Sequence, residues 1–271
     1  MPFPCAVILW AVAAAPPPKA LPIPPDLAPQ IQQSIEVGRA IYWQDKASAI
    51  GTDALLEKVG SLEGKGLTGY LTVQEGDGHG KPLPSWLVVF FTDASDPKIA
   101  YRIHVPMEQG KTPRVEVLSS PAELDPEVLK LFRARQTALE AAQPFAQPIN
   151  PVVLPAEVIG QKGVLVELLA GTDKPDTVVL GKHYRVIVTE DGRRVEQIMP
   201  LSKGILELAK GSGTVALSVS HIVTDYPLET HVFASMLNHV PIYVGTERGV
   251  WLVDGDSITL ISSNKPRARK H

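Results

Sequence analysis

The sequence contains a single cysteine, Cys5, and this scarcity excludes several kinds of chemistry. Without a second thiol the chain forms no internal disulfide, and it carries no set of cysteines that would hold zinc or run a redox reaction. No Leu-x-x-Cys pattern precedes Cys5, so a lipid anchor is not expected either.

An excess of positive charge and the common catalytic motifs are also missing. The formal net charge is −3, which gives no signature of nucleic-acid binding. Concentrated positive charge occurs only in the basic tail 265–271, where Lys265, Arg267, Arg269 and Lys270 are expected to form a solvated chain end. The sequence has no Gly-x-Ser-x-Gly, His-Glu-x-x-His, Walker A or Gly-x-Gly-x-x-Gly motif, which argues against the common hydrolases.

Near its N-terminus the chain has an apolar run at residues 5–15. The run fits the core of an export signal and is too short to span a bilayer, which takes roughly 20 residues. Ala11-Val12-Ala13 supplies a small-x-small cleavage pattern, so residues 1–13 are predicted to be a signal peptide, followed by a proline-rich linker at 14–29. No Lys or Arg precedes the run, so either the signal is atypical or the true start lies upstream of Met1. The expected location is periplasmic or secreted, and the cleaved chain would hold no thiol.

A pattern that occurs twice predicts an internal repeat. The pairs Tyr101-Arg102 and Tyr184-Arg185 lie 83 residues apart, and Val-Glu pairs follow each of them at 115–116 and 195–196. This spacing exceeds a solenoid unit and favours two copies of a small module. The predicted fold is α+β, with two tandem units, each a helix plus a four-stranded antiparallel meander, at 30–121 and 122–203. A β-rich segment at 204–264 follows.

Local patterns place the elements within these units. Helical spacing runs through 30–59, where Gly38 and Gly51 predict a break or kink. Asp125 is expected to cap a second helix that ends before Pro144, and Asp191-Gly192 predicts a type I′ hairpin. Strands are expected at 70–75, 86–92, 99–105, 114–118, 151–154, 164–170, 184–190 and 194–199. In the last segment 215–223, 230–237, 241–246, 250–253 and 257–261 are expected to be strands, although 230–238 also fits one short helix.

Two groups of residues are candidates for a site. His221, Asp225, Glu229 and His231 offer two imidazoles and two carboxylates within eleven residues, which is a ligand set for a metal ion. The alternative is that His221 is a hydrogen-bonded residue of a strand.

Arg102 and Arg185 form the second group. Because neighbouring strand residues face opposite sides, packing of Tyr101 and Tyr184 under the helices would leave both arginines on open sheet faces. There they would bind carboxylate or phosphate groups, or else pair across the strands with Glu116 and Glu196.

Several segments together resemble an uncharacterised family of exported bacterial proteins. The segments are Asn150-Pro151-Val152-Val153-Leu154-Pro155, Gly181-Lys182-His183-Tyr184-Arg185, Met199-Pro200-Leu201-Ser202-Lys203, Glu229-Thr230-His231-Val232-Phe233 and Pro241-Ile242-Tyr243-Val244-Gly245-Thr246. The resemblance implies no activity, cofactor or catalytic residue. The order of the elements is also similar to that of the PepSY and cystatin-like modules, which are often inhibitors or binding domains.

These observations favour an exported, non-enzymatic binding or inhibitory protein of the bacterial envelope. The expected partner is another envelope protein or a peptide, with no cofactor and no nucleic acid. The alternatives are a metal-assisted hydrolase that uses His221, Asp225, Glu229 and His231, and a structural envelope component without a small ligand.

Overall fold

The computed structural model describes residues 19–75, 85–92 and 95–264. Within this part of the chain there are three α-helices and fourteen strands, and the strands form four sheets. The mixed α+β class predicted from the sequence is confirmed. The predicted signal peptide at 1–13 and the basic tail at 265–271 lie outside the described residues. No helix among those described is long and apolar enough to cross a membrane.

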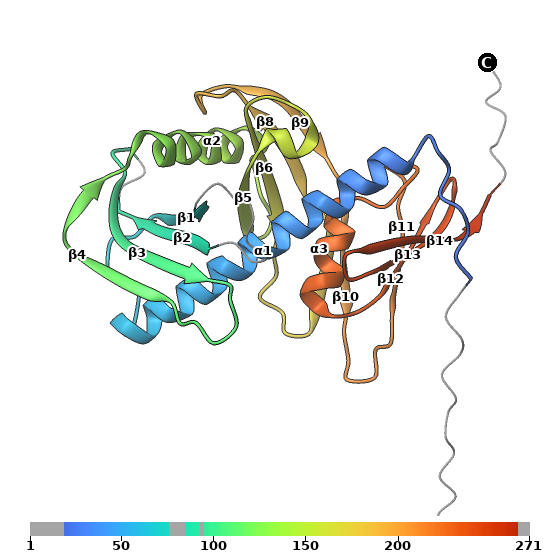
Figure 1. Ribbon diagram of the computed structural model, residues 1–271, viewed down its shortest axis with the longest axis horizontal. Helices are drawn as coiled ribbons and strands as arrows, with labels where there is room; N and C mark the ends of the chain where they lie inside the picture. The colour runs from blue at the N-terminus through green and yellow to red at the C-terminus, as the bar shows by residue number, and fades with distance from the viewer. Residues whose placement is uncertain (1–18, 76–84, 93–94, 265–271) are drawn as a thin grey trace, which may run out of the picture.

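The first helix, α1 (Ala28–Val59), runs obliquely through the whole molecule and touches three of the sheets (Figure 1). The predicted break at Gly38 or Gly51 is wrong, because α1 is continuous over 32 residues. Both glycines instead allow close packing. A Cβ on Gly38 would lie 2.6 Å from the Val232 Cβ, and one on Gly51 would lie 2.8 Å from the Val88 Cγ2.

Gly38→Ala is therefore expected to destabilise the fold by about 1–2 kcal/mol, although alanine is the better helix former. The physical reason is the collision of the new methyl group with Val232 on the crossing helix. Thermal or urea denaturation measures the change. Gly211→Ala, where the added Cβ meets nothing within 4 Å, is the control. A Gly38→Ala variant as stable as the wild type would contradict the close crossing.

The first sheet lies against the C-terminal half of α1. Its antiparallel strands are β1 (Gly69–Glu75), β2 (Ser85–Phe91), β3 (Lys98–Pro106) and β4 (Arg114–Glu123), in that order. Val88, Ile103 and Val105 pack on α1, and Val89 and Phe91 contribute to the cluster on the other face.

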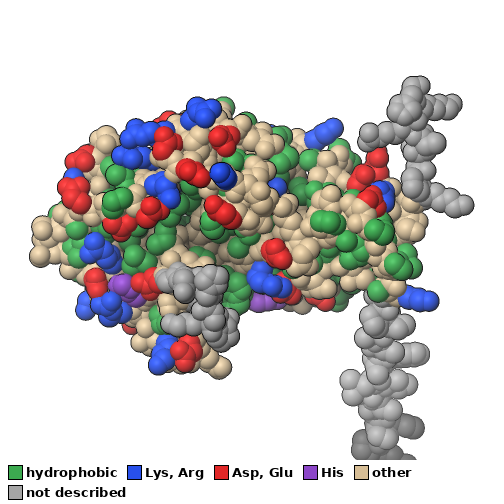
Figure 2. Space-filling model, turned by 45° about the horizontal axis from the view of Figure 1, so that its top comes forward, with side chains coloured by type: hydrophobic (Ala, Val, Ile, Leu, Met, Phe, Trp, Pro, Cys, Tyr) green, Lys and Arg blue, Asp and Glu red, His purple; other side chains and the backbone are tan. Residues whose placement is uncertain are grey.

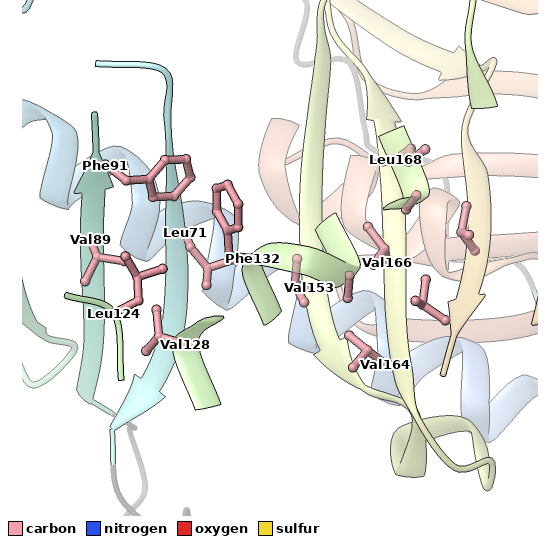
Figure 3. Close-up of a cluster of buried hydrophobic side chains, with 14 of the residues drawn as sticks. Leu71, Val89, Phe91, Leu124, Val128, Phe132, Val153, Val164, Val166 and Leu168 are labelled. Atoms are coloured by element: carbon pink, nitrogen blue, oxygen red, sulfur yellow. The ribbon is translucent and has the colours of Figure 1, made fainter. Parts of the chain in front are cut away.

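That other face packs on α2 (Pro126–Ala142), which lies between two sheets. Asp125 caps α2 as predicted, since its Oδ1 accepts a hydrogen bond of 3.0 Å from the backbone N–H of Val128. The second sheet has the order β5-β6-β8-β9, with β5 (Ile149–Pro155), β6 (Val164–Ala170), β8 (Tyr184–Val188) and β9 (Val195–Pro200). Figure 3 shows the apolar cluster that α2 shares with both sheets, in which the rings of Phe91 and Phe132 meet edge to face at 4.7 Å.

Two features of the second half differ from the sequence prediction. The turn before β9 is not type I′, because only Gly192 has a positive φ (74°), whereas type I′ needs one at Asp191 as well. In addition, β7 (Thr177–Gly181) and β10 (Ile205–Ala209) pair as a two-stranded ribbon that the sequence pattern did not reveal. A short 3₁₀ helix, η1 (Ala156–Ile159), joins β5 to β6.

The C-terminal sheet has the order β11-β12-β13-β14, with β11 (Leu217–Ser220), β12 (Ile242–Thr246), β13 (Gly249–Asp254) and β14 (Ser257–Ser263). Its first two strands are parallel and are connected by α3 (Glu229–Asn238). The prediction of a strand at 230–237 is thus wrong, and its helical alternative is correct.

The N-terminal segment also joins this part of the molecule. The Leu21 N–H donates to the carbonyl of Leu260 at 2.8 Å, and Leu27 is buried in the same apolar cluster as the sheet. The predicted proline-rich linker at 14–29 thus contributes Leu27 to a core.

Candidate functional site

Polar side chains gather where the second sheet, α3 and the C-terminal sheet meet. Four predicted site residues lie there: Arg185 on β8, Glu229 and His231 on α3, and His221 just after β11. The fold joins them in pairs. Arg185 forms an ion pair with Glu229, and the rings of His221 and His231 are 4.9 Å apart at 85°.

Arg102 and Asp225 are not part of this junction. Arg102 is half-buried on β3, and the register places it opposite Glu116 on β4. The carboxylate of Glu116 forms its ion pairs with Arg114 and His104. The Asp225 backbone carbonyl accepts a hydrogen bond of 3.0 Å from the Thr246 hydroxyl. The predicted set of four metal ligands therefore does not converge. Among the described residues, no three His, Cys, Asp or Glu side chains are placed to hold a metal ion.

Arg185 is not on an open sheet face, and that prediction is wrong. Its side chain is 11% exposed, and the register places Met199, not Glu196, opposite it. Its guanidinium lies 3.0 Å from Glu167 on β6 and 2.5 Å from Glu229 on α3. One cation is thus shared by two fully buried carboxyl groups.

Burial fixes the protonation of this triad. Loss of hydration, followed by the nearby charge of Glu229, raises the pKa of Glu167 to about 8. Burial alone would lower the pKa of Arg185, but the charges of Glu229 and Glu167 outweigh it and raise that pKa. At neutral pH Glu167 therefore carries its proton, and Arg185 carries its positive charge. The protonated carboxyl group of Glu167 can donate a hydrogen bond to the carboxyl group of Glu229.

Three buried imidazoles lie beside the triad: His183, His221 and His231, each 4–5% exposed. His183 Nδ1 accepts from the Ala170 N–H at 3.0 Å, and His231 Nδ1 accepts from the Leu228 N–H at 3.1 Å. Because Nδ1 of His231 is an acceptor, its proton is on Nε2.

The three histidines are neutral at pH 7. Burial lowers the pKa of His183 and of His221 to about 4, and burial together with the other two imidazoles lowers that of His231 to about 3. Thr224 engages His221 Nε2 through its hydroxyl at 2.9 Å and its N–H at 3.3 Å. Within the described chain His221 Nδ1 and His231 Nε2 have no hydrogen-bond partner.

These imidazoles line a cavity of about 210 Å³, here called the histidine cavity. Its walls are mainly apolar, and Lys203 is exposed at its rim beside Ile205 and Ile222, which are 44% and 65% exposed. The lining residues are Leu180, Gly181, His183, Leu201, Ser202, Lys203, Gly204, Ile205, Leu206, Val219, Ser220, His221, Ile222, Val223, Thr230 and His231.

Sequence reasoning missed Glu167, His183 and Lys203. Glu167 had a usable signal, because it is the one charged residue in the apolar strand Val-Leu-Val-Glu-Leu-Leu-Ala. Lys203 had none, because its position at the cavity depends on the β7–β10 ribbon.

The charge on the surface in Figure 2 does not indicate a binding partner. On the face drawn in Figure 2, acidic and basic side chains are interspersed, and neither sign forms one continuous patch. The chain matches no family model, no curated protein and no solved structure. Its function must therefore be argued from the site itself.

Proposed function

We propose that this chain is a non-enzymatic binding protein and that the histidine cavity takes a small molecule with an aliphatic body and a carboxylate end. The observation that carries the proposal is the combination of apolar walls with the imidazoles of two buried residues, His221 and His231, which both line the cavity. Small-molecule sites typically pair an apolar lining with a few placed polar groups.

The size and charge of the cavity define the ligand. An engineered cavity of about 150 Å³ holds benzene, so about 210 Å³ suits a ligand of roughly 6–10 non-hydrogen atoms. Leu180, Leu201 and Val219 accommodate the aliphatic body. His231 Nε2–H donates to the carboxylate, and the Lys203 ammonium at the rim balances its charge.

Binding is favoured over catalysis by the state of the polar groups. Imidazoles whose pKa values are about 3–4 are weak general bases at neutral pH. The Ser202 hydroxyl donates to the Gly204 carbonyl and accepts from the Lys182 N–H, so it is not paired with a histidine. Glu167, which titrates near neutrality, does not line the cavity.

The export signal predicted at 1–13 supports placing this binding role in the bacterial envelope, with another envelope protein or a peptide as partner. The segments that resemble the uncharacterised exported family supply His183, Lys203 and His231 to the cavity. The triad takes Arg185 and Glu229 from the same segments.

The proposal includes an origin by duplication. In both halves a helix precedes a four-stranded antiparallel sheet. Tyr101 packs in the cluster that the first sheet shares with α1, and Tyr184 packs in the cluster that contains α2. Each tyrosine thus packs against a cluster that includes residues of the helix in its own half, which supports two copies of one unit.

Isovalerate is expected to bind the protein and to raise its melting temperature, since a ligand that binds only the folded state stabilises it. Isothermal titration calorimetry measures the affinity, with 3-methylbutan-1-ol and acetate as probes that lack the charge or the aliphatic body. Both should bind more weakly than isovalerate.

Lys203→Met should weaken isovalerate binding about fivefold and leave the alcohol unaffected, as expected for an exposed charge. Lys182→Met is the matched control, because Lys182 is exposed but does not line the cavity. If none of the three probes binds at millimolar concentration, or if Lys182→Met has the same effect as Lys203→Met, the proposal is wrong.

A further inference from the structure

A second hollow is lined by residues of the first and second sheets, α1 and α2. The edge strands β1 and β5 of these sheets contact each other (Figure 1). The hollow has a volume of about 480 Å³, and we call it the inter-sheet groove. It is lined by Gln44, Val73, Gln74, Trp86, Glu127, Lys130, Leu131, Val153, Leu154, Pro155, Glu157, Gly163, Val164 and Glu190.

Gln44 of α1 connects the two edges. Its Nε2 donates to the carbonyl of Thr72 on β1 at 2.5 Å and to that of Val153 on β5 at 3.0 Å. These carbonyls therefore point away from their own sheets. Because the two acceptors fix which end of the amide is the NH₂ group, Oε1 must point elsewhere.

The two edges offer different hydrogen-bonding groups. In an antiparallel strand, alternate residues turn their N–H and C=O to the same side. On β5 the backbone groups of Val153 point outward, and so do those of every second residue from it, which include Pro151 and Pro155. Proline has no N–H, so this edge lacks donors at both positions. On β1 the outward backbone groups are those of Thr72 and of every second residue from it, which include the exposed Gln74. Because Gln44 already occupies the Thr72 carbonyl, the β1 edge keeps the N–H and C=O of Gln74 for a further strand.

Two buried polar atoms in the groove lack partners. Gln44 is 3% exposed and Trp86 is 5% exposed, and neither Gln44 Oε1 nor Trp86 Nε1 has a hydrogen-bond partner in the described chain. One is an acceptor and the other a donor. Both atoms are closed to solvent in the free protein, so a bound peptide would meet them only after the side chains of Gln44 and Trp86 turn toward the groove.

The charge at the rim favours cationic flanking residues. Glu127, Glu157 and Glu190 line the groove with a single cation, Lys130. Lys130 forms an ion pair of 2.5 Å with Glu127, so Glu157 and Glu190 are left to attract positive charge.

We propose that the inter-sheet groove binds an extended segment of another protein, flanked by Lys or Arg, which pairs with the outward edge of β1 at Gln74. This is recognition by strand addition, in which main-chain hydrogen bonds supply the affinity. Apolar or small side chains of the segment contact Val73, Leu131 and Leu154. The site is separate from the histidine cavity, so the two proposals stand or fall independently.

The test uses the full chain labelled with ¹⁵N-tryptophan and an end-capped peptide of alternating threonine and valine with a lysine at each end. The indole N–H resonance of Trp86 should shift saturably as the peptide is added. The indole of Trp251 is the internal control, because it is fully buried and already donates to the Thr246 hydroxyl at 3.0 Å.

Matched peptides and variants identify the contact. The same peptide with N-methylated backbone amides should not bind, and one with glutamate at each end should bind about tenfold more weakly. Gln74→Pro removes the outward N–H from an edge strand, where proline is tolerated, and should weaken binding about tenfold. Gln74→Ala keeps that N–H and should bind like the wild type.

Three results would overturn the inference. One is an unchanged Trp86 resonance at saturating peptide, as expected if the groove holds only water. The others are equal binding of the N-methylated peptide and equal binding by the Gln74→Pro and Gln74→Ala variants.

Discussion

Arg185→Met is expected to lower the free energy of unfolding by about 3–5 kcal/mol. The substitution removes the only cation that contacts Glu167 and Glu229 in the described chain, and both carboxyl groups are fully buried. Methionine fills most of the volume, so the loss reports the unpaired charge and not a cavity. Urea denaturation at pH 7 measures the change.

Arg102→Met is the matched control, since Arg102 occupies the corresponding Tyr-Arg pair of the first sheet but is only half-buried there. It should cost less than about 1 kcal/mol. Adding Glu167→Gln and Glu229→Gln to Arg185→Met should recover most of the lost stability, because no buried charge then remains. Equal losses for the two arginine variants would contradict the buried triad.

The second large effect concerns pH. His183, His221 and His231 have folded-state pKa values of about 4, 4 and 3, against a reference of 6.5. The unfolded chain therefore binds more protons below pH 6.5, and the stability that these groups contribute is lost as the pH falls toward 4. Each histidine changes the free energy of unfolding by about 1.4 kcal/mol per pH unit in this window.

Glu167 acts in the opposite direction. Its pKa of about 8 in the folded protein exceeds the reference of 4.5, so its contribution is lost as the pH rises from 4.5 through 8. Three histidines are opposed by one glutamate, so the free energy of unfolding should rise by about 3 kcal/mol per pH unit up to pH 6.5. Above pH 6.5 only Glu167 contributes, and the free energy of unfolding should fall by about 1.4 kcal/mol per pH unit toward pH 8. Denaturant titrations at each pH measure this maximum.

Two variants separate the groups. His231→Gln should make the acid side less steep by about 1.4 kcal/mol per pH unit, and Glu167→Gln should remove the fall above pH 6.5. A free energy of unfolding that is constant between pH 5 and 6.5 would show that the imidazoles are not held neutral by burial.

The sequence predicted the fold where local patterns decide the structure. The cap at Asp125 and the strand periodicity of 99–105 depend on neighbouring residues, and both predictions are confirmed. The role of Gly38 depends on Val232, far along the chain, so a glycine that permits close packing was interpreted as a helix break. The short segment at 230–237 fits both periods, and only its packing between α1 and the C-terminal sheet selects the helix.

The candidate site was predicted less completely. The metal hypothesis required His221 and His231 to meet, and their rings do, but it also required Glu229 and Asp225 as ligands. Glu229 instead contacts Arg185, whose place depends on the register of β8, and the pairing of β8 with β9 shifts at Ile187. No local pattern encodes such a register shift or the distant ribbon that brings Lys203 to the cavity.

The most direct test of the proposed binding function is a crystal structure of the protein grown with isovalerate. We predict density for the ligand in the histidine cavity, with its carboxylate within hydrogen-bond distance of His231 Nε2 and its branched end against Leu180, Leu201 or Val219. An empty cavity at saturating isovalerate, or density for the ligand only elsewhere on the molecule, would contradict the proposal.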